Sequence, residues 1–189
     1  MHRIIIGVSG ACGMPIAEEL LKNILKVPNT ETHLVISRGS ERVLQSECNS
    51  GTEILTRYAH KTYDAKDMSA APASGAWQND GMIICPCSMS SLASIASGAG
   101  MNLIHRSADV TLKERRPLII APRETPLNLI HLRNMQLVTE AGATIMPFAP
   151  AFYNNTTSFK DMIQYFSGRM LDQLHIEHNL CLRWGDDIH

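Results

Sequence analysis

The fold is decided by the stretch "RIIIGVSGACGMPIAEELLKNIL", residues 3–25. It opens with a short apolar run, 3–10, that ends in glycines, which is typical of a buried strand. Apolar residues at helical spacing follow over 15–25, and Pro15 suits the first turn of a helix. A strand that passes through a glycine-rich turn into a helix predicts a βα unit, the building block of α/β domains.

The same alternation continues along the chain. Further strands are predicted at 32–39, 81–88, 117–123 and 144–150, and further helices at 40–48 (with Ser40 as N-cap), 90–98, 103–115, 126–142 and 158–174. Short apolar strands between helices indicate a parallel sheet covered on both faces. Residues 49–80 break the rhythm, and "APASGAWQND" (71–80) is interpreted as a loop. The prediction is an α/β fold, a single domain over 1–189 with a doubly wound, mostly parallel, Rossmann- or flavodoxin-like sheet and a C-terminal tail from about 175.

The composition is that of an ordinary globular protein, with 189 residues, 44% hydrophobic, 19% charged and a formal net charge of −1. This charge gives no reason to expect nucleic acid or an anionic membrane as a partner. No apolar run approaches the roughly 20 residues of a membrane-spanning helix. The N-terminus lacks the longer apolar region of a signal peptide. We therefore expect a cytoplasmic protein with neither a nucleic-acid nor a membrane partner.

The five cysteines are odd in number and show no disulfide spacing. Cys85 and Cys87 form C-P-C rather than the C-x-x-C of redox or zinc sites, so buried reduced thiols are expected. His175 and His178 could share a helix face, but no cysteine or carboxylate set completes a metal site with them. We expect no bound metal.

Glycines follow the first strand at a spacing of three, as Gly7, Gly10 and Gly13. Glycine lets a backbone approach a ligand closely, and the start of the next helix offers N–H groups to a phosphate. The pattern is not G-x-G-x-x-G, and Ser37 closes the second strand where a dinucleotide site usually has an acid. This favours a mononucleotide such as FMN over NAD. The alternative is a tight βα turn with no ligand.

Hydroxyl groups gather at a second junction of strand and helix, where Ser88, Ser90 and Ser91 follow the strand at 81–88. Three hydroxyls can donate to a phosphate or to flavin oxygens, and the helix dipole adds to this. Simple capping of the helix is the alternative, and it needs only one hydroxyl.

A charged pair, Arg123 and Glu124, follows the strand at 117–123. The guanidinium offers a planar fork to a phosphate or carboxylate, and Glu124 is either a proton-handling group or half of an ordinary ion pair. Lys113 precedes the same strand and should lie at its opposite end, where it could point at a neighbouring subunit. Tyr153 and Arg169 form a further hydroxyl–cation pair, for which plain surface exposure is the alternative.

The chain resembles the UbiX-type flavin prenyltransferases, including the Pad-type B subunits of hydroxyarylic acid decarboxylases. The resemblance spans nearly the whole sequence. It rests on "GVSGACG" (7–13), "ETHLVISR" (31–38), "DGMIICPCSMSSLASIASG" (80–98), "NLIHRSADVTLKERRPLIIAPRETPLNLIHLRNM" (102–135), "PAFY" (150–153), "GRMLDQL" (168–174) and "RWG" (183–185).

The resemblance implies an activity. Members of this family join the dimethylallyl group of dimethylallyl phosphate to N5 and then C6 of reduced FMN, without a metal. The product, prenylated FMN, serves UbiD-type decarboxylases. Family members assemble as homododecamers with active sites between subunits, which would bring Lys113 of one chain to the site of another.

The resemblance also implies roles for individual residues. The flavin would be held by Gly10, Ala11, Cys12, Ser37, Ser88, Met89, Ser90, Ser91 and Arg123. The allylic phosphate and its surroundings would involve Arg106, Lys113, Glu124, Tyr153, Arg169 and Trp184. Catalytic roles would fall to Cys12, Glu47, Lys113 and Glu124. Cations around a departing phosphate suit such a reaction, because they stabilise the charge that develops there.

Two positions depart from the family pattern. Cys12 stands where a serine or threonine is usual, and Ala76 stands where many members carry a second serine. Because a thiol is a poorer hydrogen-bond donor than a hydroxyl, transfer could be slower here. Two other functions stay open. One is a non-catalytic FMN-binding accessory subunit of a decarboxylase. The other is an FMN-dependent cysteine decarboxylase, although Gly75 replaces the asparagine of its "ASAN"-like motif.

Overall fold

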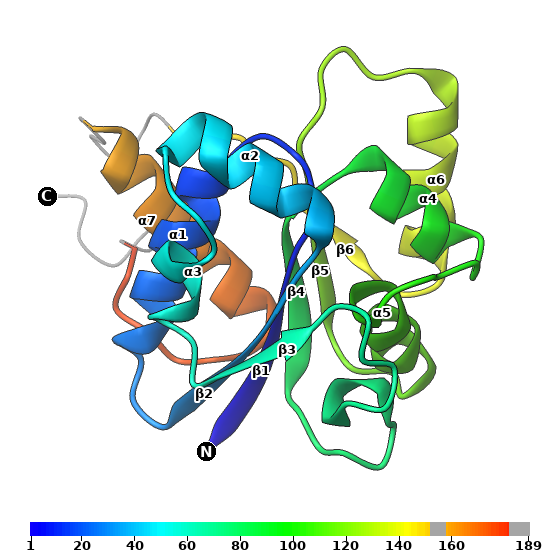
Figure 1. Ribbon diagram of the computed structural model, residues 1–189, viewed down its shortest axis with the longest axis horizontal. Coiled ribbons are helices and arrows are strands. Elements are labelled where there is room, and N and C mark those ends of the chain that lie inside the picture. The colour runs from blue at the N-terminus through cyan, green and yellow to red at the C-terminus, as the bar shows by residue number, and fades with distance from the viewer. Residues whose placement is uncertain (152–157, 182–189) are drawn as a thin grey trace, which may run out of the picture.

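The protein is described by a computed structural model that covers residues 1–151 and 158–181 (Figure 1). Its centre is one six-stranded sheet in the order β3-β2-β1-β4-β5-β6, and every neighbouring pair is parallel. The strands are β1 (His2–Val8), β2 (Thr30–Ile36), β3 (Lys61–Asp64), β4 (Gly81–Cys87), β5 (Leu118–Pro122) and β6 (Thr144–Ile145). The predicted doubly wound parallel sheet is confirmed, with the strand order of a Rossmann domain.

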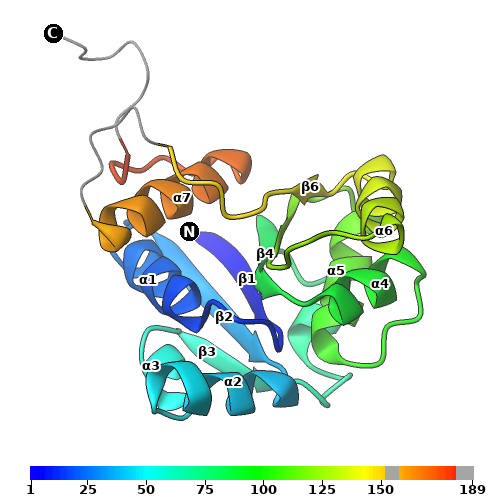
Figure 2. The ribbon, with the colours of Figure 1, turned by 90° about the horizontal axis from the view of Figure 1, so that it is seen from above.

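Helices cover both faces of the sheet (Figures 1 and 2). One layer holds α1 (Met14–Leu25), α2 (Arg38–Cys48), α3 (Glu53–Thr56) and α7 (Phe159–Gln173); the other holds α4 (Met89–Ala96), α5 (Leu103–Lys113) and α6 (Leu129–Glu140), with the short 3-10 helix η1 (Ala71–Ala73) beside α5. None of the helices in the described residues is long and apolar enough to span a membrane.

Strands β4 and β5 are apolar throughout, and β1 is apolar from Ile4 onwards, because both faces of these strands pack against a helical layer. In β1, Ile4 and Ile6 join the core beneath α1 and α7, whereas Ile5 joins the core beneath α4 and α5. All three side chains are completely buried. The unbroken apolar runs of the sequence therefore arise from burial on two sides, as predicted.

Three predicted boundaries need correction. The break at 49–80 contains a short helix, α3, and the edge strand β3, whose sequence Lys-Thr-Tyr-Asp is mostly exposed and so lacks an apolar pattern. Strand β6 spans Thr144–Ile145 rather than 144–150. Helix α2 begins at Arg38, so its N-cap is Ser37 and not Ser40.

The carboxyl ends of β1, β4 and β5 come together where the strand order reverses. Connections from β1 lead towards one side of the sheet and connections from β4 towards the other, which makes the β1–β4 junction the topological switch point. Ligands of open α/β sheets bind in the crevice at such a point. Most of the residues singled out in the sequence lie here.

Candidate functional site

The glycine-rich turn after β1 has structural reasons for two of its glycines. Gly13 is the residue before α1 and has φ of 111°, a left-handed conformation that other residues rarely adopt. A Cβ on Gly10 would lie 2.9 Å from the backbone carbon of Gly39, so the turn packs directly against the start of α2. The fold by itself thus explains these glycines. Evidence for a bound ligand therefore comes from the side chains around the turn.

Glu47 of α2 occupies the N-terminus of α1. Its carboxylate oxygens accept hydrogen bonds from the backbone N–H of Gly13 (2.9 and 3.1 Å) and of Met14 (2.9 Å). These N–H groups are therefore not free for a phosphate, which corrects that part of the sequence-based interpretation. Partial burial raises the pKa of Glu47, but bonds from Cys12, Met14 and Gly13 and the charge of Arg123 outweigh burial and hold this pKa below its usual value. Glu47 is an ionised anchor of the turn.

Arg123 joins the end of β5 to the same turn. Its Nε donates to the carbonyl oxygen of Cys12 at 3.3 Å, and its backbone N–H donates to the carbonyl of Cys87 at 3.2 Å. Glu124 beside it is exposed and accepts the N–H of Thr125 at 3.0 Å. A hollow of about 280 Å³ opens here, lined by Gly13, Ile16, Pro122, Arg123, Glu124, Thr125, Pro147, Phe148 and Phe159.

The serine hydroxyls form a connected cluster at the ends of β1 and β4. Ser88 caps α4 by accepting the N–H of Ser91 at 3.2 Å, and its oxygen lies 3.0 Å from that of Ser90. Ser9 accepts the N–H of Ser88 at 2.8 Å and donates to the carbonyl of Pro86 at 3.2 Å. Capping explains one hydroxyl only, so Ser90 and Ser91 remain for other partners. Ser9 lies at a predicted strand end, but its partners could not be predicted because they are 77 to 79 positions away in the sequence.

A second hydroxyl pair holds the end of β2. Ser37 and Ser40 lie 3.0 Å apart, and Ser40 donates to the carbonyl of Val8 at 2.8 Å. Ser40 is completely buried, whereas Ser37 is half-buried and faces the same edge as the glycine turn. Hydroxyl groups from β1, β2 and β4 thus surround the switch point.

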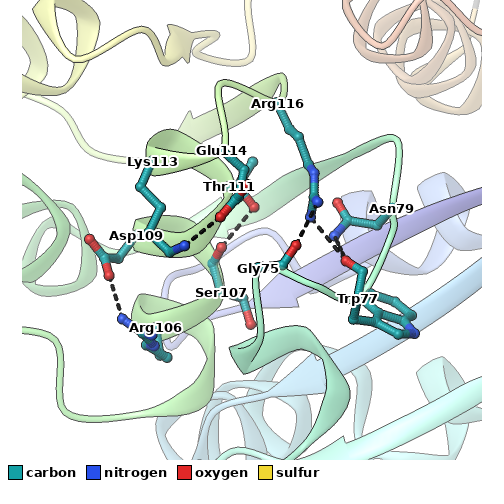
Figure 3. Close-up of polar contacts among 10 residues, drawn as sticks. All are labelled: Gly75, Trp77, Asn79, Arg106, Ser107, Asp109, Thr111, Lys113, Glu114 and Arg116. Atoms are coloured by element: carbon teal, nitrogen blue, oxygen red, sulfur yellow. Dashed lines mark hydrogen bonds and ion pairs between the residues drawn. The ribbon is translucent and has the colours of Figure 1, made fainter.

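The predicted phosphate-binding cations of α5 lie elsewhere in this chain (Figure 3). Lys113 is exposed and pairs with Glu114, next to Gly75. Arg106 pairs with Asp109 at 2.7 Å. Nearby, Arg116 donates to the carbonyls of Gly75 (2.8 Å) and Trp77 (3.0 Å) and ties the loop before β4 to the end of α5. Lys113 precedes β5 and Arg123 follows it, so the two lie at opposite ends of this strand, as predicted.

The remaining predicted residues fall in the C-terminal third. Arg169 is exposed on α7 and pairs with Asp172 at 2.6 Å. Phe159 at the start of α7 lines the hollow beside Arg123, and Arg169 is roughly 15 Å further along the helix axis. Tyr153 and Trp184 lie outside the described residues.

Asp172, His178 and Cys181 form a cluster that the sequence did not reveal, with potential ligand atoms within 4.8 Å of one another. Both ring nitrogens of His178 are engaged, Nε2 with Asp172 at 3.1 Å and Nδ1 as acceptor of the N–H of Leu180 at 3.1 Å. A carboxylate and a cysteine therefore do accompany His178, contrary to the sequence-based interpretation, and these bonds and the Arg169 ion pair hold the cluster together. Among the cysteines, Cys85 and Cys87 are buried thiols, and burial raises the pKa of each to about 12.

Comparisons with known proteins place these features in context. A family model described as Flavoprotein matches residues 1–170. Flavin prenyltransferase LpdB of Lactiplantibacillus plantarum is 45% identical over 187 residues, which cover 99% of this chain and 100% of that protein. Flavin prenyltransferase UbiX of Deinococcus radiodurans is 41% identical over 185 residues, covering 98% of this chain and 94% of that one.

Solved structures give the same result. A crystal structure of AnUbiX (PadA1) in complex with FMN and dimethylallyl pyrophosphate has a TM-score of 0.92 and 43% identity, covering 97% of both chains. A dodecameric FMN-dependent UbiX-like decarboxylase from Escherichia coli O157:H7 has a TM-score of 0.91 and 38% identity, covering 96% of this chain and 98% of that chain. The peptidyl-cysteine decarboxylase EpiD, at 17% identity and a TM-score of 0.63, shares the fold alone.

Proposed function

The chain belongs to the flavoprotein family and, within it, to the UbiX-type flavin prenyltransferases, and from this premise we propose the reaction that it catalyses. It transfers the dimethylallyl group of dimethylallyl phosphate to N5 and C6 of reduced FMN and releases prenylated FMN. The observation that carries the proposal is the match of nearly the whole chain to a relative that holds FMN and dimethylallyl pyrophosphate.

The donor set at the switch point fits a flavin mononucleotide. Neutral hydroxyl and backbone donors suit the carbonyl oxygens of the ring, and an exposed guanidinium suits an anion. Both kinds are present, as the serine cluster at the start of α4 and as Arg123. The residues that hold the flavin are Gly10, Ala11, Cys12, Ser37, Ser88, Met89, Ser90, Ser91 and Arg123. When bound and reduced, the flavin supplies the nucleophilic ring atoms N5 and C6.

The leaving phosphate requires more cations than one chain brings to the site. Breaking the allylic C–O bond leaves the electron pair on phosphate, and preorganised cations stabilise the charge that develops. Arg123 is the predicted cation that this chain places at the carboxyl edge, while Lys113 and Arg106 lie on α5, away from the hollow. We therefore assign Lys113 and Arg106, together with Tyr153, Arg169 and Trp184, to sites completed between subunits.

An exposed apolar surface on α6 supports this assembly. Leu129 and Ile130 are 60% and 66% exposed, and Leu132 and Leu137 are about half exposed, whereas Val138 is buried. A run of exposed apolar side chains on one helix marks an interaction surface. A relative 38% identical is dodecameric. A homododecamer with shared active sites is the assembly that we propose.

Proton removal from C6 needs a base, which we assign to Glu124 or to the departing phosphate rather than to Glu47. The Glu47 oxygens already accept three backbone hydrogen bonds, and its lowered pKa makes it a weak base near neutral pH. Glu124 is exposed at the mouth of the hollow. Glu47 then acts by fixing the turn that carries Cys12.

The wider setting follows from the product. Prenylated FMN is useful only to an enzyme that employs it, so we propose a UbiD-type decarboxylase as recipient and the cytoplasm as the compartment where the two meet. The reaction uses no metal, and residues 1–189 act as one FMN-binding domain.

One experiment separates this enzyme from a non-catalytic FMN-binding subunit. The protein is mixed anaerobically with reduced FMN and dimethylallyl phosphate, and the flavin is extracted for absorption and mass spectra. We expect a new flavin spectrum and the added mass of one C5H8 unit. Unchanged FMN that stays bound would instead support the accessory subunit, and oxidation of a C-terminal cysteine peptide in a parallel assay would support a cysteine decarboxylase.

A further inference from the structure

A buried histidine of α5 contacts the serine cluster at the start of α4. His105 is 8% exposed, and its Nε2 lies 3.1 Å from the hydroxyl oxygen of Ser91, which is 6% exposed. The two residues are 14 positions apart and belong to different helices. His105 is in none of the site roles assigned above.

The neighbours of His105 determine which ring nitrogen carries the proton. The backbone N–H of Met101 donates to Nδ1 at 3.4 Å, so Nδ1 is an acceptor. Burial lowers the pKa of His105, and the ring is neutral at pH 7. A neutral imidazole has a single N–H, which must then lie on Nε2 and donate to Ser91. The amide nitrogen of Asn102, at 3.5 Å from Nε2, is at the outer limit for a hydrogen bond.

The Ser91 oxygen also accepts the hydroxyl of Ser88, at 3.2 Å. With both lone pairs of this oxygen engaged, the hydroxyl proton of Ser91 has to be donated elsewhere. With Ser88 and His105 both acting as donors to Ser91, no hydrogen bond within residues 1–151 and 158–181 accepts this proton. A buried donor without a partner is costly, so an acceptor atom is expected beside Ser91 when the site is filled.

We propose that His105 is a positioning residue of the flavin site. By donating to Ser91 it reserves the Ser91 hydroxyl proton for an acceptor atom of the bound flavin. The inference rests on the proposed function, because it takes FMN as the ligand. It predicts that His105 affects flavin affinity only through Ser91.

The chain supplies a matched control. Asn128 and His131 begin α6 with the same Asn-Leu-Ile-His sequence that begins α5 at Asn102. In α6, Nδ1 of His131 accepts the N–H of Asn128 at 3.4 Å, and Nε2 lies 3.3 Å from the Asn128 amide nitrogen; in the described part of the chain no hydrogen bond joins this ring to a serine. A substitution at His131 therefore perturbs the start of a helix in the same way but leaves the serine cluster untouched.

The test measures the Kd of FMN for the wild-type protein and for the variants H105N, H105Q, S91A, H105N/S91A and H131N. Asparagine can replace the Nδ1 acceptor but not the Nε2 donor, whereas glutamine places an N–H near Nε2. Losing one hydrogen bond to an oriented hydroxyl should weaken FMN binding about tenfold in H105N. H105Q should recover most of that loss, and H131N should match the wild type. The double variant should bind no more weakly than S91A. Repeating the titration with riboflavin, which lacks the phosphate, shows which part of FMN accepts the Ser91 proton. If the acceptor is on the flavin ring, the ratio of the H105N Kd to the wild-type Kd stays the same; if it is on the phosphate, the ratio falls to one.

Several outcomes would overturn the proposal: wild-type affinity in H105N, equal losses in H105N and H105Q, or additive losses in the double variant. Nitrogen NMR of the His105 ring in the wild-type protein gives an answer that needs no variant, because the proposal requires the neutral form with the proton on Nε2, and a proton on Nδ1 refutes it. If the wild-type protein binds no FMN at all, the proposed function fails, and the role of His105 fails with it.

Discussion

The beginnings of α5 and α6 have the same sequence and opposite surroundings. Asn102 and Asn128 each start an Asn-Leu-Ile-His segment and accept the N–H of the histidine three residues later, at 3.1 and 2.9 Å. Yet Leu103 and Ile104 are completely buried, while Leu129 and Ile130 are 60% and 66% exposed. The cap is a local property of the sequence, whereas burial depends on what the rest of the chain places beside the helix.

The difference extends to the two histidines. His131 folds back on Asn128 through Nδ1, which completes a capping box. In α5 the Nδ1 of His105 accepts from Met101, one residue earlier, and Nε2 is turned towards Ser91. A shift of one residue in the partner of Nδ1 therefore converts a capping histidine into one that contacts the functional site. The apolar neighbours of His105, Leu103 and Ile104, are buried and hold that arrangement in place, whereas the corresponding neighbours of His131 are exposed.

The largest expected effect comes from truncating Ile104, the buried isoleucine of the two Asn-Leu-Ile-His segments. Ile104 packs over Gly7 of β1, where a Cβ built on the glycine would lie 3.0 Å from the isoleucine Cγ2. Ile104→Ala should lower the free energy of unfolding by about 2–5 kcal/mol, because it removes buried methyl groups and leaves a cavity. Urea denaturation measures this change.

Ile130→Ala is the matched control. In a chain kept monomeric it should change stability by no more than about 0.5 kcal/mol. Equal losses at the two positions would mean that the exposed segment of α6 is buried in the single chain, and the contrast between the helices would be lost.

The next effect concerns assembly. Ile130→Glu places a charge in the exposed apolar surface of α6 and should yield a folded, smaller species in light scattering. Because Lys113 would then no longer reach a neighbouring site, prenyl transfer should fall about a hundredfold or more, as expected when a preorganised cation is lost. Leu25, which is 48% exposed on α1, provides the control as Leu25→Glu. An oligomer of unchanged size would exclude α6 from the interface.

Much of the fold is readable from the sequence because the central strands are buried on both faces. Strands β4 and β5 and residues 4–8 of β1 are apolar throughout, and glycine or a capping side chain marks the helix that follows. Strand β3 was missed because it is a polar edge strand that owes its conformation to pairing with β2. Periodicity reports burial, so an exposed strand leaves no signal.

The site was less predictable, because its contacts join distant segments. Strand ends and the family resemblance led to Ser88, Ser91 and Arg123, but no local pattern indicates that Glu47 binds the N-terminus of α1, 33 and 34 positions away. His105 is hidden for the same reason: its sequence context is repeated at His131, where the ring hydrogen-bonds to the residue that caps its own helix. The assignments of Lys113, Arg106 and Arg169 depend on neighbouring subunits and stay predictions.

A smaller effect tests the asparagine N-cap that the two segments share. Asn102→Ala and Asn128→Ala each remove a side-chain oxygen that accepts a backbone N–H, and each should cost about 1 kcal/mol of unfolding free energy. The measurement is best made in the Ile130→Glu background, where assembly does not contribute. A loss several times larger at Asn102 would show that its cap also holds His105 against Ser91, and the two caps would no longer be equivalent.

The smallest effect is a dependence of stability on pH. Burial lowers the folded-state pKa of His105, so the unfolded chain binds this proton more readily than the folded one. Above the ordinary histidine pKa of about 6.5 neither state binds the proton, and His105 costs no stability. As pH falls from there through the folded-state value, proton binding by the unfolded chain lowers the free energy of unfolding. H105Q cannot bind the proton, so the difference in unfolding free energy between wild type and H105Q should favour the wild type less at pH 5.5 than at pH 7.5. Parallel pH curves for the two proteins would mean that His105 is not held neutral in the fold, which would also remove the reason for placing its proton on Nε2.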